Sequence, residues 1–435
     1  MFPERLMLRV VSARPGATLV LAMSVLAGCD SSGSDRDADS GFVTRDSAGV
    51  TIAENADNDP AAVAAWSVDT APSITIGVSM GDSAYEFSRI GGVRQLPNGM
   101  IVVLNGQGES AFELRFYDST GKHLATHGRR GQGPGEYRWI NFFGSVGGDT
   151  VIAVDFPNSR LNWISASGGY LRSRRLDENR FKKLLGDDVS GTIEGMVPLG
   201  DSQYAVKAFR HVPGATSPAR LGTSFHIVDL AANTASDLVR YDDPPLKVVQ
   251  VSSGPTHLWP MSAGTSVHVV DRARRRMCAA NSSAPEISCI DSQGKRLSIR
   301  WRTETIPYTD DDRRAYEASF RKTRLTSRRT TAADVEALLA ATERPERHLP
   351  FSVLQIDADG NFWILEYVLD AWQRRDSRFR VFDPEGRHIA FADPFPARNA
   401  GLGSTVHIGA SSVIRVVEDR DGAPVVGVFR IRKPG

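Results

Sequence analysis

The stretch LQIDADGNFWIL, residues 354–365, joins two apolar runs through a short turn that contains aspartate, glycine and asparagine. This pattern is typical of a β-hairpin, because a tight turn needs a positive φ that glycine adopts at little cost. The phrase recurs along the chain as QLPNGMIVVL (95–104), SVGGDTVIAV (145–154), MVPLGDSQYAV (196–206), WPMSAGTSVHVV (259–270) and VHIGASSVIRVV (406–417). Hairpins that return about every 50 residues indicate a repeat protein built from strands.

A second hairpin phrase follows most copies of the first. It has a strand, a turn with an acidic or small residue and a glycine, and another strand, as in RFYDSTGKHLA (115–125), NWISASGGYLR (162–172), SCIDSQGKRLS (288–298) and RVFDPEGRHIA (380–390), with HIVDLAANTAS (226–236) as a weaker copy. Two hairpins in series make a unit of four antiparallel strands. The six copies of the first phrase therefore predict an all-β fold, a six-bladed β-propeller.

The two ends of the propeller are predicted to meet in one blade. The last unit has only three strands before the chain ends, and the segment PSITIG (72–77) is a spare strand. We expect this N-terminal strand to close the ring as the outer strand of the last blade, which removes an open sheet edge. The propeller is assigned to residues 43–435, although the strands in VTRDSAGVTIA (43–53) have no predicted place in it.

Residues 306–348 do not alternate like strands. Thr309 precedes three aspartates, and Thr331 stands three residues before Asp334, which are two signals for the start of a helix. We expect a helical insertion between blades 4 and 5. Its many arginines belong either to a solvated helix face or to a docking surface that partly covers the propeller.

The N-terminus has the features of a targeting segment. Arg5, Arg9 and Arg14 precede a short apolar core, which ends in LAGC at residues 26–29. LAGC resembles the lipobox of bacterial lipoproteins, and this resemblance implies that Cys29 carries the lipid. Residues 1–28 are then a signal peptide, residues 29–42 a flexible polar tether, and lipid alone attaches the protein to a membrane.

If Cys29 carries lipid, Cys278 and Cys289 remain as an even pair in an oxidising compartment. They flank a predicted hairpin loop, and we expect a disulfide across it. Two cysteines at this spacing are too few for a metal site.

Longer segments also resemble a known family. The chain resembles the six-bladed β-propeller lipoproteins of bacteria, which are relatives of NHL-repeat and TolB-like propellers. The segments that support this are residues 26–29, RDSAGVTIAEN (45–55), GRRGQGPGEY (128–137), VIAVDFPNSRLNWI (151–164) and DADGNFWILEY (357–367). The resemblance implies a protein of the bacterial cell envelope that faces the periplasm or the cell surface.

Charge and motifs exclude several classes of protein. The 52 Lys and Arg nearly balance the 51 Asp and Glu, which gives no electrostatic reason to expect nucleic acid as a partner. The glycine-rich stretch GRRGQGPGEY (128–137) lacks the glycine spacing and the following helix of a phosphate-binding loop. We interpret it as a connector between two blades.

The candidate ligand face consists of polar residues that end the predicted second strand of each blade. They are Asn105, Asp155, Lys207, Asp271, Glu366 and Glu418. If a metal binds, Asn105, Asp155 and Glu366 are its expected ligands, because Ca²⁺ prefers oxygen donors. Six-bladed hydrolases of the gluconolactonase and paraoxonase kind hold calcium with such residues. The alternative is that these residues are ordinary strand ends that pair with arginines.

Two functions follow from these observations. The first is a binding or scaffolding module without a cofactor, whose partner is a protein, a peptide or a glycan; no catalytic residue is assigned in it. The second is a calcium-dependent hydrolase or lyase, of the lactonase or esterase type, with its site at the central channel.

Overall fold

The computed structural model describes residues 36–37, 41–56, 63–106, 108–167, 169–186, 189–211, 221–244, 246–325, 330–366, 378–395 and 405–434. The predicted signal peptide, Cys29 and most of the tether lie outside these residues. No helix in the described part of the chain has the length and apolar character needed to cross a membrane.

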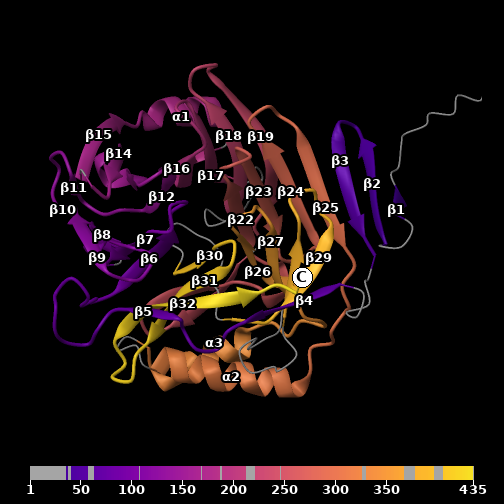
Figure 1. Cartoon of the computed structure of the whole chain (residues 1–435). Coiled ribbons are helices and arrows are strands. Elements are labelled where there is room, and N and C mark those ends of the chain that lie inside the picture. Colours follow the sequence, from indigo (N-terminus) through magenta and orange to yellow (C-terminus); the bar gives the residue numbers. More distant parts are fainter. Residues whose placement is uncertain are drawn as a thin grey trace, which may run out of the picture. The chain divides into compact units, whose positions relative to one another are not determined.

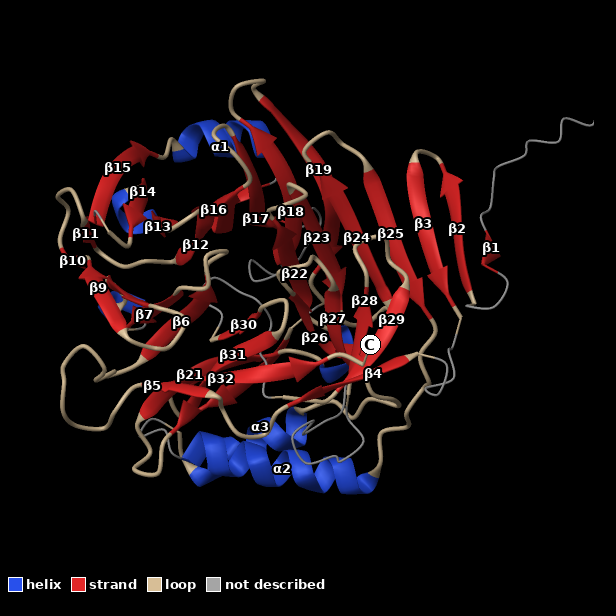
Figure 2. Cartoon of the chain, viewed as in Figure 1, coloured by secondary structure: helices blue, strands red, loops and turns tan. Residues whose placement is uncertain are grey.

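The structure is mostly β, and its sheets have a propeller-like arrangement (Figures 1 and 2). Three sheets contain four antiparallel strands each, in chain order. They are β6 (Ile90–Gln95), β7 (Ile101–Asn105), β8 (Glu113–Tyr117) and β9 (His123–His127); β12 (Phe142–Gly147), β13 (Thr150–Asp155), β14 (Arg160–Ser165) and β15 (Gly169–Arg175); and β16 (Val189–Pro198), β17 (Gln203–His211), β18 (Leu221–Asp229) and β19 (Thr234–Asp242). This is the four-stranded unit that the two hairpin phrases predict.

The fourth sheet contains strands from two distant parts of the chain. Its first four strands are β22 (Ser266–Asp271), β23 (Arg276–Asn281), β24 (Glu286–Asp291) and β25 (Arg296–Trp301). The sheet continues with β3 (Val50–Asn55), β2 (Phe42–Ser47) and β1 (Arg36–Asp37). Because β3 pairs in parallel with β25, the N-terminal hairpin covers the outer edge of this sheet.

The largest sheet joins two strands from the first 80 residues to the C-terminal strands. It contains β26 (Phe351–Ile356), β27 (Phe362–Glu366), β28 (Phe379–Phe382) and β29 (His388–Ala392), then β4 (Ala64–Val68), and then β32 (Pro424–Arg432), β31 (Ser412–Glu418) and β30 (Val406–Ile408). The short strand β5 (Ile74–Ile76) pairs with β32 along its length. The sequence predicted this pairing of the N-terminal strand with the last strand.

Two helices lie between β25 and β26 in the chain, α2 (Asp310–Leu325) and α3 (Ala332–Ala341). Thr331 and Asp334 form the capping box of α3, as their spacing predicts. α3 contacts the hairpin of β20 (Lys247–Val251) and β21 (Gly254–Leu258). Several arginines of the helices pair with acids of the same two helices, for example Arg321 with Glu336 at 2.7 Å. α1 (Glu178–Leu185) joins β15 to β16.

Apolar residues between neighbouring sheets form the core. The facing side chains of the β12–β15 and β16–β19 sheets make one large cluster, which includes Ile152, Leu161, Val206 and Phe225. Cys278 and Cys289 stand directly opposite each other on β23 and β24 and form the expected disulfide. Both cysteines are buried in a neighbouring core cluster.

The connector between β9 and β12 is held by its own side chains and by the next sheet. The Glu136 carboxylate accepts hydrogen bonds from the backbone of Gln132 and Gly133 and pairs with Arg129. Arg160 donates to the carbonyl oxygens of Gln132 and Gly133, both at 2.9 Å. β10 (Arg129–Arg130) and β11 (Glu136–Tyr137) pair inside this segment. The structure thus agrees with a connector and not with a phosphate-binding loop.

Candidate functional site

A cavity of about 1110 Å³ is lined by strands from five of the sheets. The contributing strands include β6, β12, β16, β22, β26 and β30. The turns that follow these strands also contribute residues, such as Pro97, Gly200, Ala273 and Ala410. The cavity therefore lies at the end of the sheets where the first strand turns into the second.

Three arginines bring positive charge into the lining, Arg94, Arg172 and Arg272. Arg94 lies on β6, and its guanidinium stands 5.6 Å from the ring centre of Phe143. Arg272 lies in the turn between β22 and β23. Burial lowers the pKa of Arg94 and of Arg272 to about 10, so both stay charged at neutral pH.

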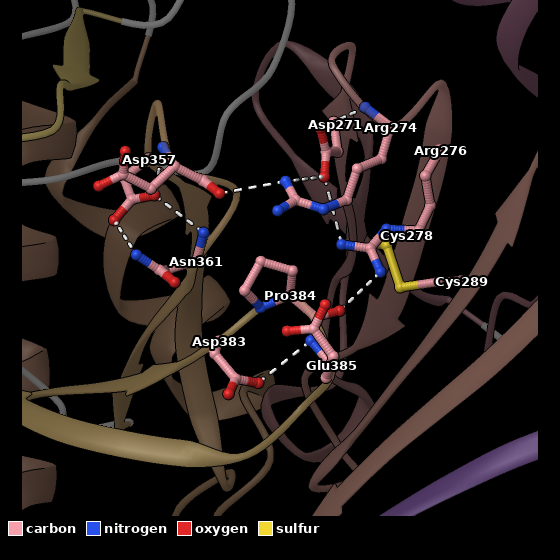
Figure 3. A network of polar contacts seen from close by, with 11 residues as sticks. Asp271, Arg274, Arg276, Cys278, Cys289, Asp357, Asn361, Asp383, Pro384 and Glu385 are labelled. Atoms are coloured by element: carbon pink, nitrogen blue, oxygen red, sulfur yellow. Dashed lines mark hydrogen bonds and ion pairs between the residues drawn. A yellow bond between two sulfur atoms is a disulfide. The ribbon is translucent and has the colours of Figure 1, made fainter.

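Two acids of the lining are already engaged by other residues (Figure 3). The Asp271 carboxylate pairs with Arg274 and Arg276, each at 3.2 Å. The Asp357 carboxylate accepts hydrogen bonds from Trp363 Nε1 at 2.9 Å and Asn361 Nδ2 at 2.8 Å. Burial raises the pKa of Asp357, which these two hydrogen bonds partly offset. These carboxylates serve the fold and do not neutralise the lining arginines.

The two histidines of the lining are neutral. Burial lowers the pKa of His268 and of His407 to about 3. A second cause is a nearby cation, which is Lys207 for His268 and Arg94 for His407. At neutral pH both imidazoles therefore offer hydrogen-bonding groups without charge.

The cavity continues outward along the face of the β12–β15 sheet. Gly144, Ile152, Trp163 and Arg172 stand directly opposite one another on the four strands, and all four line the cavity. The Arg172 guanidinium lies 3.9 Å from the ring centre of Trp163, a cation–π contact. This cross-strand row forms a floor with an apolar middle and an aromatic outer part.

Five of the six predicted face residues do not line this cavity; only Asp271 does. Asn105, Asp155, Glu366 and Glu418 end β7, β13, β27 and β31 at the far end from the cavity turns, and Lys207 lies in the middle of β17. Their side chains contact neighbours on the same or an adjoining segment. Lys207 pairs with Glu194 at 2.7 Å and Glu366 with Arg380 at 2.8 Å, whereas Glu418 is exposed.

Asp271 differs from its predicted position. The sequence placed it at the end of a second strand, but β22 is the first strand of its sheet. The preceding WPMSAG segment does not form a strand: it contains a short 3₁₀ helix, Met261–Ala263, and Gly264 follows with a φ of 69°. The Ser-Ala-Gly sequence is therefore a real turn signal, but it marks the end of a loop before β22 and not the turn of a hairpin.

The expected calcium ligands do not form a common ligand set. Asn105 donates to Glu113 at 3.1 Å, and Arg115 holds that Glu113 at 2.6 Å. Asp155 accepts from Asn158 Nδ2 at 2.8 Å and from the backbone of Arg138 at 3.0 Å. Within the described ranges, no three His, Cys, Asp or Glu side chains gather as a metal would require. The Oδ1 atom of Asn105 is buried there without a hydrogen-bond partner, but calcium needs about six to eight oxygens.

The feature of the lining that sequence reasoning missed is Arg272, whose buried Nη1 atom lies beside Gly144. An ideal Cβ at Gly144 would lie 3.3 Å from Arg272 Nη1. In the sequence, Arg272 belongs to the charged run DRARRR (271–276), whose arginines were all candidates for ion pairs with Asp271. Only the fold separates Arg272 from Arg274 and Arg276, which do make those pairs.

Comparison with known proteins bears on the fold. No family model and no curated protein matches the chain. Among solved structures, a DUF4221 family member from Bacteroides vulgatus is 10% identical, with a TM-score of 0.47 over 85% of this chain and 99% of that one. A virginiamycin B lyase from Staphylococcus aureus is 10% identical, with a TM-score of 0.35 over 84% and 99%. A calcium-binding regucalcin from Agrobacterium tumefaciens is 10% identical, with a TM-score of 0.31 over 85% and 97%. Identities this low say nothing about activity.

Proposed function

We propose that this protein is a six-bladed β-propeller of the cell envelope that binds a peptide or glycan partner in its central cavity and does not catalyse a reaction. The observation that carries the proposal is the cavity itself, to which strands of five sheets contribute. Its size is that of a typical ligand site, and its lining combines apolar surface with a few polar groups. A partner inserts one chain end or one residue there.

The aromatic floor favours a peptide or a glycan over other partners. Trp163 lines the cavity and is half-buried, so one edge of the indole is available to a ligand. Amphipathic aromatic rings contact sugar rings and peptide side chains well, because they combine a large apolar face with a polar edge.

The metal-dependent hydrolase is the weaker alternative. Its proposed ligands Asn105, Asp155 and Glu366 belong to three different sheets, and each already has a protein partner. A metal would have to break those contacts before it could polarise a substrate. Nothing in the described residues favours that exchange.

Location and attachment belong to the same proposal. The LAGC segment supports lipid attachment at Cys29 after removal of residues 1–28, and the disulfide suits an oxidising compartment outside the cytoplasm. In the six-bladed arrangement, the helices α2 and α3 are an insertion between blades 4 and 5.

Lipid attachment can be tested with labelled palmitate. The label should enter the wild-type chain in its host but not a Cys29→Ala variant; equal labelling would refute the anchor.

The binding function is tested with peptide and glycan arrays probed with the purified chain. We expect Ala410→Trp, in the turn that lines the cavity after β30, to abolish the signals by filling the cavity. The control is Glu418→Trp at the opposite end of β31, which should bind as the wild type does. Binding that survives Ala410→Trp but not Glu418→Trp would move the site to the other face. Calcium-dependent turnover of a lactone or ester panel would refute the non-catalytic function.

A further inference from the structure

Arg272 differs from the other arginines of its turn. Arg274 and Arg276 pair with Asp271, and Arg275 donates to Gln203 on β17. The Nη1 atom of Arg272 is buried and has no hydrogen-bond partner among the described residues. Arg274 and Arg275 of the turn and Arg276 at the start of β23 thus serve the fold, whereas Arg272 lines the cavity.

This arrangement is costly for the protein without a ligand. A buried guanidinium that lacks a counter-ion loses its hydration and gains little in return. Burial is the one cause that lowers the pKa of Arg272, and at about 10 the group remains charged. The nearest acid in sequence, Asp271, is taken by Arg274 and Arg276. An anion from outside the chain would supply the missing partner.

Gly144 allows the guanidinium to approach the β12 backbone closely. It is buried on β12, and any Cβ there would lie 3.0 Å from Phe142 Cζ and 3.3 Å from Arg272 Nη1. The missing side chain therefore lets Arg272 Nη1 lie close beside the β12 backbone in the cavity lining. Arg94, on β6, adds a second positive charge to the same lining.

The cross-strand row gives the shape of the rest of the ligand. From Gly144 the row continues through buried Ile152 to half-buried Trp163, with Arg172 stacked on the indole. A ligand with its anionic group at Arg272 would place its next atoms against Ile152 and then reach the aromatic ring. Such a surface favours a flat or apolar group about one ring in size.

We propose that the cavity binds an anionic group, a carboxylate or a phosphate, through Arg272, and that an apolar ring on the same ligand contacts Ile152 and Trp163. The proposal rests on the proposed function, because it names the ligand chemistry of the same cavity. For a peptide, the anionic group would be a terminal or side-chain carboxylate; for a glycan, an acidic sugar or a phosphate. Guanidinium binds both kinds of anion through paired N–H donors.

Calorimetric titration of the purified full chain tests this with three small probes of similar shape. They are 3-phenylpropionate, phenyl phosphate and the neutral 3-phenylpropionamide. We expect at least one anion to bind and the amide to bind about tenfold more weakly or not at all. The preferred anion then distinguishes carboxylate from phosphate. Amide binding as tight as anion binding, or no heat with any probe, would overturn the proposal.

Variants separate the site from the fold. Arg272→Gln should weaken anion binding about tenfold or more. Arg275→Gln removes the same charge from the same turn and should bind the anion as the wild type does. Unliganded Arg272→Gln should melt at the same temperature as the wild type or higher, because it loses a desolvated charge. Gly144→Ala should also weaken anion binding, although it leaves the charge of the protein unchanged. Unaltered binding by Arg272→Gln, or its failure to fold, would overturn the assignment.

The two proposals can fail separately. If array binding is lost in Ala410→Trp but unchanged in Arg272→Gln, the cavity is the binding site and the anion proposal is wrong. If anions bind at Arg272 but no peptide or glycan does, the partner class proposed above is wrong and the anion site stands.

Discussion

Strand-end carboxylates and Arg272 show how the partners of a charged side chain decide its role. Glu366 and Arg272 are both polar groups close to strand ends, and neither can be assigned from residue type alone. Glu366 is paired with Arg380, which is 6% exposed, so the pair is part of the fold. Arg272 and Arg380 each have a buried donor atom without a hydrogen-bond partner in the described chain, but burial alone shifts the pKa of Arg272, with no acid acting on it. A polar group that is desolvated and unsatisfied calls for a ligand or for an explanation.

The Glu366–Arg380 pair yields a stability prediction. Glu366→Ala leaves a buried guanidinium without its carboxylate, and we expect a loss of about 3 kcal/mol in the free energy of unfolding. Glu418→Ala, at the exposed end of β31, should change it by no more than about 0.5 kcal/mol. Urea denaturation measures both. Similar small changes in the two variants would mean that Glu366 is free to serve as a ligand after all.

Residue-level prediction from the sequence succeeded where the partner was local and failed where it was distant. The capping residues Thr331 and Asp334 and the disulfide at Cys278 and Cys289 were predicted, since each depends on a short separation in sequence. The approach of Arg272 to Gly144 depends on how two sheets meet, across more than a hundred residues. No spacing rule in the sequence encodes such a contact.

At the scale of elements, hairpins were predicted well and the order of strands less well. Glycine turns located the hairpins β6–β7, β12–β13 and β26–β27 at the expected residues. Asp271 was placed on the wrong strand because WPMSAG (259–264) resembles the first half of a hairpin phrase. The parallel pairing of β3 with β25 was not predicted, because no turn connects these strands.

The attachment of α3 gives a prediction on pH. The Asp334 carboxylate accepts hydrogen bonds from the Ser252 side chain, from its backbone at 2.7 Å and from Thr331, and these bonds, Ser252 first, lower the pKa of Asp334. Because the folded-state pKa is depressed, the stabilisation is present above the ordinary aspartate pKa of about 4 and is lost as the pH falls towards the folded value.

Asp334→Asn should therefore lower the urea midpoint at about pH 6, and its difference from the wild type should shrink at about pH 3. Asp311→Asn is the control, since Asp311 is exposed on α2 and pairs with Arg314 of the same helix. It should have little effect at either pH. A difference for Asp334→Asn that is as large in acid as at neutral pH would contradict a role for the charged carboxylate.

In the whole molecule, the early strands β4 and β5 share one sheet with the C-terminal strands. β5 pairs with β32, and Ile76 on β5 is completely buried in a core cluster with Val426 and Ile90. Repetition of a hairpin phrase could predict the units, and a count of strands could predict this pairing. Neither the repetition nor the count could predict that β4 would also link β29 to β32.

The stability of the molecule should depend on that closure. Ile76→Ala removes a buried side chain from β5 and should cost about 3 kcal/mol of unfolding free energy in a single cooperative transition. Thr75→Ala, exposed on the same strand, should cost no more than about 0.5 kcal/mol. If β5 were a dispensable arm, Ile76→Ala would resemble Thr75→Ala in thermal and urea unfolding.

We propose that the ligand site is the cavity at the turns after the first strands, with Arg272 as its cation, and not the strand ends around Asn105 and Glu366. A crystal structure of the chain grown with 3-phenylpropionate and calcium would show which of these two places binds. We expect ligand density in the cavity, with the carboxylate at Arg272 Nη1 and the ring against Trp163. Density for the ligand or a calcium ion beside Asn105, Asp155 and Glu366, with the cavity free of ligand, would contradict it.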